Sequence, residues 1–477
     1  MHAFLTEYWP HLAFAVSTIA GIAAAVHAAM TKTDVRAATG WVAVVLLSPF
    51  FGAFLYLIAG INRVRRRAVR RRRRARNRAH GLEAGAAQVG VVSCPSLVRL
   101  GDSVSPFRLR PGNRIAPLAG GDEAYPAMIE AIQGAKRSIA LATYIFDHDS
   151  AGLAFVQALG EAHARGVVVK VLIDGVGSRY SKPPIARALA KQGIAPALFM
   201  SDVIGLGLPY ANLRSHRKIL VIDGHLAFTG GMNIREHFLS VAMGEDMAHD
   251  THFRVEGPVV DQLLTIFAED WAFTTTENLQ GARWFGHEAH EDLEDGMLAR
   301  TVPSGPDSSL ESTHAMLMGA LAVAQERVLL STPYFLPDQQ LVGAFGVAAR
   351  RGIAVDIVIP KANNLKLVDY AMTAQLDQVI RHGCRVWRAL GAFDHSKLLT
   401  VDGSWSYIGS SNLDPRSLRL NFELDVEVHD ARLAAWIESR LRARIANSEA
   451  ETLETLMARP PLARLRNRAV WLASPYL

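Results

Sequence analysis

Two long apolar runs open the chain, ahead of any pattern of shorter segments. Residues 12–30 are interrupted by His27, and residues 41–61 contain no charged side chain. Each run has the length of a helix that crosses a bilayer, and a short loop joins the two. A cleaved signal peptide is disfavoured because residues 1–10 carry no Lys or Arg. The pattern therefore predicts a transmembrane helical hairpin over residues 1–61.

From about residue 111 the apolar positions recur in shorter segments with helical and extended periods. In the first part, helices are predicted at 125–136 and 151–165, and strands at 138–146 and 167–174. The same order returns later, with strands at 328–334 and 355–359. Strand 167–174 is almost continuously apolar, which is typical of a sheet covered on both faces. The predicted fold is α/β, with two pseudo-symmetric halves packed into one catalytic unit.

A polar motif occurs once in each half and gives the strongest evidence for a duplication. Five positions agree at a constant offset of 179 residues (395 minus 216 for the histidines): His216 and His395, Lys218 and Lys397, Asp223 and Asp402, Gly230 and Gly409, and Asn233 and Asn412. Agreement at five positions in one register indicates an internal repeat. Each copy predicts a strand, a tight Asp-Gly turn and a return strand, with His and Lys on one face.

The residue types in this motif fit phosphodiester chemistry. Lysine is seldom a metal ligand, and the motif lacks the cysteine or carboxylate partners of a zinc site, so neither a metal nor another cofactor is predicted. A neutral imidazole can attack phosphorus, while a second, protonated imidazole gives its proton to the departing alkoxide. Lysines and asparagines can hold the charge of the non-bridging oxygens. This division of labour needs two histidines, which the duplication supplies.

The paired pattern H-x-K-x4-D-x6-G-(S/G)-x-N resembles that of the phospholipase D superfamily. The whole chain, with its hydrophobic N-terminus, resembles the bacterial cardiolipin synthases. The resemblance implies that both halves are phospholipase D-like, that the histidines are the nucleophile and the acid/base, and that six residues are catalytic: His216, Lys218, Asp223, His395, Lys397 and Asp402.

Three further residues are predicted to bind the substrate phosphate, namely Asn233, Ser410 and Asn412. The first copy departs from the pattern, because Gly231 stands where the second copy has Ser410. A hydroxyl donor is therefore missing on one side of the predicted phosphate cradle.

A second polar echo follows each motif. Asp250, at the start of Asp-Thr-His-Phe-Arg-Val, aligns with Glu423, at the start of Glu-Leu-Asp-Val-Glu-Val. An imidazole that presents a lone pair needs its other ring N–H held by an acceptor, and we expect these carboxylates to supply it. In the family that the chain resembles, the element Asn421-Phe-Glu423 has this kind of place. The alternative is an ordinary carboxylate at a strand end.

The chain divides into five predicted segments. They are two transmembrane helices (1–61), an Arg-rich juxtamembrane segment and linker (62–110), the first half (111–295), the second half (296–457) and an amphipathic tail (458–477). The first half carries an extra apolar stretch within 198–214, either a packed loop or a wall of an acyl-chain path. The tail mixes arginines with apolar residues and predicts either an interfacial helix or a helix docked on the enzyme.

The basic charge of the chain is local. The formal net charge is +6, but eleven arginines lie within residues 63–78, and subtracting them leaves −5 for the remainder. Nucleic acid is therefore not an expected partner. Arginines directly after the second apolar run predict a multi-pass protein of the inner (cytoplasmic) membrane with its catalytic part in the cytoplasm, and they also attract anionic lipid. Two cysteines cannot form a disulfide framework.

The resemblance and the motif chemistry together predict a membrane-anchored phosphatidyltransferase that makes cardiolipin and glycerol from two phosphatidylglycerol molecules, through a phosphohistidine. Its partners are then membrane phospholipids, phosphatidylglycerol and cardiolipin among them, and no nucleotide is needed. One alternative is a phospholipase D-type hydrolase or nuclease, in which water resolves the intermediate. Another is a non-catalytic membrane scaffold, which predicts decay of the motifs, whereas both are complete here.

Overall fold

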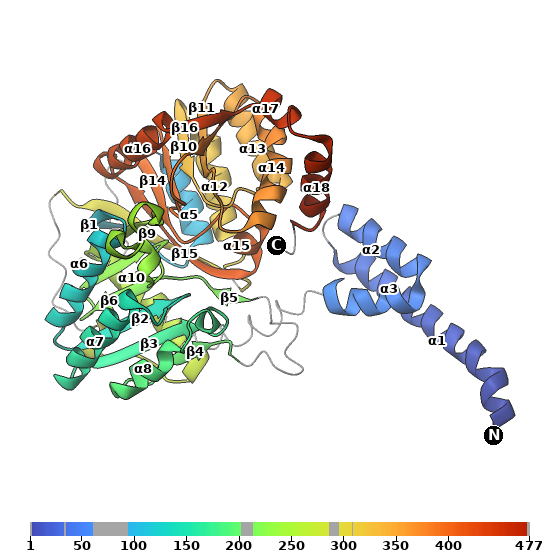
Figure 1. Ribbon diagram of the computed structural model, residues 1–477, viewed down its shortest axis with the longest axis horizontal. Coiled ribbons are helices and arrows are strands. Elements are labelled where there is room, and N and C mark those ends of the chain that lie inside the picture. The colour runs from blue at the N-terminus through green and yellow to red at the C-terminus, as the bar shows by residue number, and fades with distance from the viewer. Residues whose placement is uncertain are drawn as a thin grey trace. The chain divides into compact units, whose positions relative to one another are not determined.

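The computed structural model describes residues 2–32, 35–60, 94–201, 213–285, 295–307 and 309–474 (Figure 1). They belong to two compact units, one of N-terminal helices and one of mixed α/β structure. The Arg-rich run at 63–78 and most of the 198–214 stretch lie outside the described residues, so what the sequence predicts for them stays a prediction.

The N-terminal unit contains α1 (His2–Thr31), α2 (Val35–Leu47), α3 (Pro49–Leu55) and a π-helical turn, η1 (Tyr56–Gly60). Within α1, Tyr8–Thr31 is long and apolar enough to cross a membrane, and it is the one such helix among the described residues. The polar interruption in this run has a partner inside the unit, because His27 Nδ1 lies 2.8 Å from the hydroxyl of the buried Tyr56.

The second arm of the predicted hairpin is not one continuous helix. It breaks at Ser48, and Pro49, which lacks a backbone N–H, begins α3. Gly52 then packs on the backbone of α2, where an added Cβ would lie 2.5 Å from Val44 O. With 13 residues, α2 is about 20 Å long, which is shorter than the roughly 30 Å hydrocarbon core. The prediction of a second spanning helix is therefore not confirmed.

The α/β unit is built on one mixed sheet whose two sides repeat each other outward from the centre. On the first side the order is β1 (Arg110–Ala119), β8 (Thr251–Glu256), β7 (Leu226–Gly230), β6 (Ile219–Ile222), β2 (Ser138–Thr143), β3 (Val168–Asp174) and β4 (Ala197–Phe199). On the second side it is β9 (Met297–Ser304), β15 (Asn421–His429), β14 (Trp405–Gly409), β13 (Leu398–Val401), β10 (Arg327–Ser331), β11 (Ala354–Pro360) and β12 (Arg385–Ala389), with β16 (Ser448–Glu451) at the edge. The predicted duplication into two α/β halves is confirmed.

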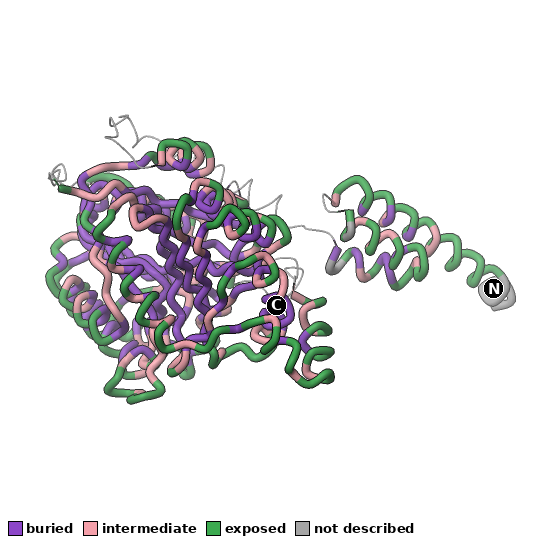
Figure 2. Tube along the Cα trace, turned by 90° about the horizontal axis from the view of Figure 1, so that it is seen from above, coloured by how far each residue is buried: buried purple, intermediate pink, exposed green. Residues whose placement is uncertain are grey.

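Helices cover both faces of this sheet. In the first half they are α6 (Gly121–Gly134), α7 (Ser150–Ala164) and α8 (Ile185–Lys191), with α10 (Val259–Thr275) on the opposite face. In the second half they are α12 (Ser312–Val323), α13 (Gln339–Arg350) and α14 (Lys366–Ile380), with α16 (Ala431–Ala446) opposite. Figure 2 shows the buried residues concentrated in the strands and the exposed ones on the outer helices.

Short elements join and flank these layers. They are η2 (Gly177–Arg179), β5 (Arg214–Ser215), η4 (Glu236–Phe238), α9 (Ser240–Met243), η5 (Gly244–Asp246), α11 (Ala282–Phe285), α15 (Pro415–Arg419), α17 (Leu453–Met457) and α18 (Pro461–Leu472). Strands β2, β6 and β13 are buried at every position, which agrees with a sheet covered on both faces.

The predicted linker ends earlier than residue 110, because α5 (Pro95–Val104) packs on the second half. Its Gly101 leaves room for a guanidinium, since an added Cβ would lie 1.8 Å from Arg300 Nη2. The fully buried Arg300 binds Asp102 of α5 and Glu427 of β15, both at 2.6 Å. A buried cation needs such acceptors, and α5 supplies one of them.

We expect Arg300→Leu to lower the free energy of unfolding by about 3–5 kcal/mol, because the buried carboxylate of Glu427 loses its cationic partner. The matched control is Arg108→Leu. Arg108 also contacts Asp102, at 3.0 Å, but its side chain is 64% exposed, so the loss should stay below about 1 kcal/mol. Denaturant unfolding in detergent solution measures both, and equal losses would contradict a special part for the buried pair.

Candidate active site

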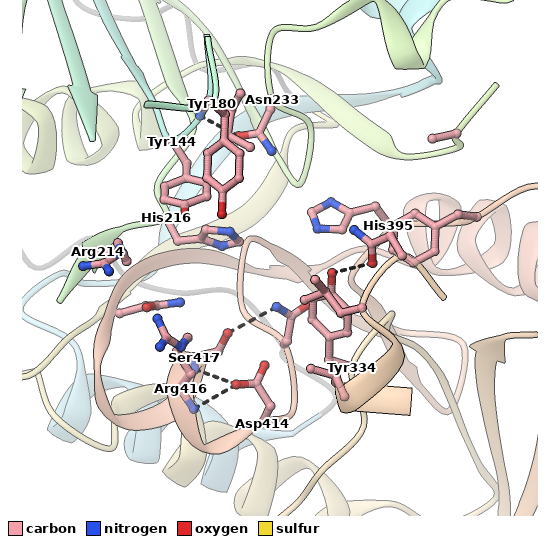
Figure 3. A pocket seen from close by; sticks show the side chains of 18 of the residues that line it. Tyr144, Tyr180, Arg214, His216, Asn233, Tyr334, His395, Asp414, Arg416 and Ser417 are labelled. Carbon is pink, nitrogen blue, oxygen red and sulfur yellow. Dashed lines mark hydrogen bonds between the residues drawn. The ribbon is translucent and has the colours of Figure 1, made fainter. Parts of the chain in front are cut away.

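The two halves exchange backbone at the point where the histidines lie. β5, directly before His216, pairs in parallel with the start of β15 in the other half, and His216 N donates to Phe422 O at 2.8 Å. In the same way, His395 N donates to His249 O at 2.7 Å, just before β8. The imidazole ring centroids of His216 and His395 are consequently 6.5 Å apart, and Figure 3 shows both rings facing one space.

The carboxylates behind the histidines also cross between the halves. Asp250 Oδ2 lies 2.9 Å from His395 Nδ1, and Glu423 Oε2 lies 3.3 Å from His216 Nδ1. Both carboxylates are fully buried. Each histidine thus has as its acceptor the carboxylate of the opposite half, and the same arrangement occurs twice.

The environment favours neutral imidazoles. Burial lowers the pKa of His216, and the nearby Lys218 lowers it further. Burial also holds the pKa of His395 well below its ordinary value, with Lys397 acting in the same direction. In a neutral ring the nitrogen that donates to a carboxylate carries the hydrogen, which assigns N–H to Nδ1 and the lone pair to Nε2.

The two motif lysines are buried beside the histidine backbones. Lys218 Nζ donates to His216 O at 2.7 Å, and Lys397 Nζ donates to His395 O. Burial lowers the pKa of Lys218 to about 7 and that of Lys397 to about 8. The approach of a phosphate anion favours the charged form of both lysines.

We expect kcat/KM for a phosphodiester substrate to fall as the pH rises through about 7 to 8. The sign follows from the lysines: their pKa values in the free enzyme are depressed, so the charged forms that attract phosphate are lost earlier than for an exposed lysine. An initial-rate series from pH 6 to pH 10 measures this limb. In Lys397→Arg the arginine stays charged over this range, so one titrating group is removed and the fall of kcat/KM with pH should be less steep. A profile that stays flat up to pH 10 would contradict the assignment.

The motif aspartates do not reach the histidines. Asp223 follows β6 and Asp402 follows β13, at the strand ends remote from His216 and His395. Each carboxylate accepts three backbone N–H groups at 2.6–2.9 Å, from 136–138 for Asp223 and from 325–327 for Asp402. Neither lines the cavity. Their expected catalytic part is therefore corrected to a structural one, which holds the start of β2 or β10 against the Asp-Gly turn.

The predicted substrate-binding residues separate into two groups. Asn233 and Asn412 line the cavity, and Asn233 Oδ1 accepts from Ile145 N at 3.1 Å, which leaves its NH2 group as the donor to an anion. Ser410 does not line the cavity, and its hydroxyl donates to Glu423 Oε2 at 2.6 Å. In the structure Ser410 holds the carboxylate behind His216, and its predicted contact with phosphate stays a prediction.

The asymmetry between Ser410 and Gly231 thus concerns the carboxylates. An added Cβ at Gly231 would lie 2.6 Å from Asp250 Oδ1, so that half has no room for a hydroxyl side chain. Glu423 accepts from Ser410 and from Asn421 Nδ2, the latter at 3.0 Å. The pKa of Glu423 is lowered, since His216 and its other partners outweigh the effect of burial, whereas burial raises the pKa of Asp250 to about 6.

A cavity of about 710 Å³ lies in front of the two imidazoles. Tyr144 and Tyr334 flank it, one from each half, with ring centroids 4.9 Å from His216 and 6.3 Å from His395 (Figure 3). The rest of the lining is mixed, with basic, acidic, amide and apolar side chains that include Arg214, Arg235, His237, Asp246, Leu336, Asn364, Leu365, Phe393, Asp414 and Arg416.

Sequence reasoning missed Tyr144 and the arginines of this lining. In the register of the repeat Tyr144 aligns with Pro333 and Tyr334 aligns with Ile145, so the repeat gave no signal for this pair of rings. The arginines carry no signal beyond their nearness to the motifs. The described residues contain no group of three or more His, Cys, Asp and Glu side chains placed to hold a metal ion.

Comparison with known proteins agrees with this geometry. The family model "Cardiolipin synthase, PLD-like domain" matches residues 128–271 and 317–445, and "Phospholipase_D-nuclease N-terminal" matches residues 19–60. Cardiolipin synthase A of Pseudomonas fluorescens (strain SBW25) is 30% identical over 98% of this chain and 99% of its own length. Cardiolipin synthase A of Pseudomonas aeruginosa (strain LESB58) is 32% identical over 96% and 94%.

Among solved structures, phosphatidylserine synthase from Haemophilus influenzae Rd KW20 shares the fold, with a TM-score of 0.62 at 16% identity, covering 80% of this chain and all of that one. A duplicated α/β sheet that turns two H-x-K motifs toward one cavity defines a phospholipase D-superfamily enzyme. Within that superfamily the chain belongs to the cardiolipin synthase family, since both halves match its model and its relatives align over nearly the full length. Family membership and the apolar helix α1 indicate a membrane-associated phosphatidyltransferase.

Proposed function

We propose that this protein is a cardiolipin synthase that transfers a phosphatidyl group from one phosphatidylglycerol to a hydroxyl of a second, giving cardiolipin and glycerol. The observation that carries the proposal is the pair of imidazoles, 6.5 Å apart in one cavity, each backed by a buried carboxylate. One group can then act on phosphorus while the other handles the proton.

In the first proposed step, His216 Nε2 attacks phosphorus and forms a P–N bond. The P–O bond to glycerol breaks, and His395 in its protonated form gives its Nε2 proton to the departing oxygen. We assign His216 as the nucleophile because the pKa of Glu423, its acceptor, is lowered against the effect of burial by His216, Lys218 and Ser410, so the carboxylate can balance the positive charge that develops on the ring. The substrate anion supports protonation of His395.

In the second step, a hydroxyl of another phosphatidylglycerol enters the position that glycerol left. His395 Nε2 takes its proton, the new P–O bond forms, and the P–N bond to His216 breaks. One phosphodiester replaces another, so the exchange needs no nucleotide. Lys218, Lys397, Asn233 and Asn412 are proposed to hold the non-bridging oxygens as charge builds on them.

The proposal places the α/β unit on the cytoplasmic side of the inner membrane, on the basis of the arginines at 63–78. The multi-pass topology and the five-segment division are part of the same proposal. Spin labels on residues 94–201 that are reduced by an impermeant reagent added on the cytoplasmic side support this orientation, and protection from that reagent contradicts it.

The purified full chain in phosphatidylglycerol vesicles tests the activity. We expect cardiolipin and glycerol in equal amounts. Phosphatidic acid in place of cardiolipin would identify a hydrolase and overturn the proposed transfer, and cleavage of added DNA would identify a nuclease.

A further inference from the structure

The C-terminal helix α18 is fixed to the α/β unit by one face. It packs along α14, with the Arg466 guanidinium 3.6 Å from the ring centroid of Tyr370 and Arg468 Nη2 3.0 Å from Asp377 Oδ2. Asn467 is buried and Trp471 half-buried in the same contact. Figure 1 shows α18 on the outside of α14, near the C-terminus. The tail predicted from sequence is therefore docked on the enzyme.

The opposite face of α18 is apolar and exposed. Leu462, Leu465 and Leu472 are 80%, 66% and 74% exposed, and Ala469 lies between them. Steps of three, four and three residues place these four side chains in one stripe along the helix. A contiguous stripe of exposed leucines indicates a surface that binds an apolar partner or enters a membrane.

Arginines border the stripe on both edges. With about 100° between successive residues, Arg466 lies on one edge, and Arg464 and Arg468 lie on the other. On the Leu465 side a groove of about 380 Å³ separates α18 from α14 and α17. Its lining contains four arginines and a single carboxylate: Arg381, Arg459, Arg464, Arg468 and Asp377. Arg381 and Arg468 share Asp377, and Arg459 contacts Glu451, so the arginines around the stripe still outnumber their carboxylate partners and leave a net positive charge.

The stripe leads to the mouth of the active-site cavity. Ser474, just after α18, lines that cavity together with Leu365 and Val368 at the start of α14. Leu365 and Leu367 are themselves 47% and 56% exposed. A lipid that enters the cavity from this side passes apolar side chains before it reaches the two imidazoles.

We propose that α18 and the start of α14 form a lipid-contact surface that lies in the headgroup region of an anionic bilayer and opens the active-site cavity toward it. The inference rests on the proposed function, because it assumes that the substrate is a membrane lipid. The leucines insert among the acyl chains, and the arginines on both edges contact headgroup phosphates. A second copy of this chain fits the surface poorly, since pairing two stripes brings arginines of like charge together.

The first test measures where Leu465 lies. The full chain, with Cys94→Ser to remove the half-exposed thiol and with Cys384 left buried, carries Leu465→Cys labelled with an environment-sensitive fluorophore. In vesicles of phosphatidylglycerol and phosphatidylcholine we expect a blue shift and at least twofold quenching by brominated acyl chains. The control, Leu153→Cys on α7 of the first half, is 42% exposed and should show neither. A label at 465 that remains in water overturns the proposal, and so does disulfide cross-linking of the unlabelled Leu465→Cys protein to a second copy.

The second test separates this surface from the chemistry. Leu462→Asp together with Leu465→Asp should lower turnover of bilayer phosphatidylglycerol about 10-fold to 100-fold, while turnover of a monomeric short-chain phosphatidylglycerol stays unchanged. Leu153→Asp should change neither rate. If the unmodified chain fails on the short-chain substrate, the proposed function fails. If that substrate is turned over and the double variant keeps its full rate on bilayers, the lipid-contact surface alone is refuted.

Discussion

His216→Ala is expected to lower kcat for cardiolipin formation by about 10⁵-fold to 10⁶-fold, the largest loss of any single replacement, because the group that bonds to phosphorus is gone. His395→Ala should cost about 10³-fold to 10⁴-fold, since it removes proton transfer and leaves the nucleophile. Cardiolipin formed from labelled phosphatidylglycerol, measured with the full chain in vesicles, compares the two variants.

A substrate with a better leaving group distinguishes the two roles. The p-nitrophenyl ester of phosphatidic acid releases a weakly basic phenolate that needs no proton, so His395→Ala should regain the first step and release a burst of p-nitrophenol. His216→Ala should show no burst. If the burst appears in His216→Ala instead, the roles of the histidines are exchanged. If neither variant loses activity, the imidazole pair is not the catalytic apparatus.

The second large effect concerns the crossed carboxylates. Glu423→Gln is expected to lower kcat by about 10³-fold to 10⁴-fold, because an amide cannot both fix the Nδ1–H tautomer of His216 and balance the positive charge on the ring. Asp250→Asn should have a comparable effect on the natural substrate, acting through His395.

The same leaving-group comparison tests the crossing. Although Glu423 belongs to the second half, its variant should behave like His216→Ala and show no burst with the p-nitrophenyl ester. Asp250→Asn should be rescued, as His395→Ala is. Ser410→Ala is the graded control: it keeps the carboxylate and removes one hydrogen bond to it, for which we expect a loss of about 10-fold to 100-fold. Rescue that follows the half in which each carboxylate lies would refute the crossed pairing.

Much of the architecture was accessible from the duplication. One constant offset between two polar motifs predicted two related α/β halves, and the apolar periods placed β2, β3, β10 and β11 within a few residues of their observed bounds. The expected carboxylates, Asp250 and Glu423, were found from the same echo and lie against the histidines. These predictions succeeded because repeats and strand periods are local properties of a sequence.

The features of the site that could not be predicted from the sequence depend on contacts between distant segments of the chain. The pairing of β5 with β15, which sends each carboxylate to the opposite histidine, joins residues about 200 apart. Ser410 was assigned to phosphate because its motif position invites that interpretation, whereas the buried Glu423 takes its hydroxyl. The motif aspartates were predicted to be catalytic, whereas each carboxylate accepts hydrogen bonds from three backbone N–H groups.

The break in the second apolar run did have a signal. Pro49 stands in the middle of that run, and a proline cannot continue the hydrogen-bonding of the helix before it. We predicted one continuous spanning helix from the hydropathy of the run and gave no weight to the proline. The helix α5 was missed for a different reason, because its contacts are with the second half, among them the ion pair of Asp102 with Arg300, which lies about 200 positions further along.

The exchange of carboxylates between the halves has an evolutionary consequence. A half of this fold, folded by itself, holds a histidine without its acceptor and an acceptor without its histidine. One half could therefore complete its histidine–carboxylate pairs only with a second half, and within one chain the two halves can differ from each other, as they do at Ser410 and Gly231. Cutting the present chain between β8 and β9 should yield two inert polypeptides whose activity returns on mixing.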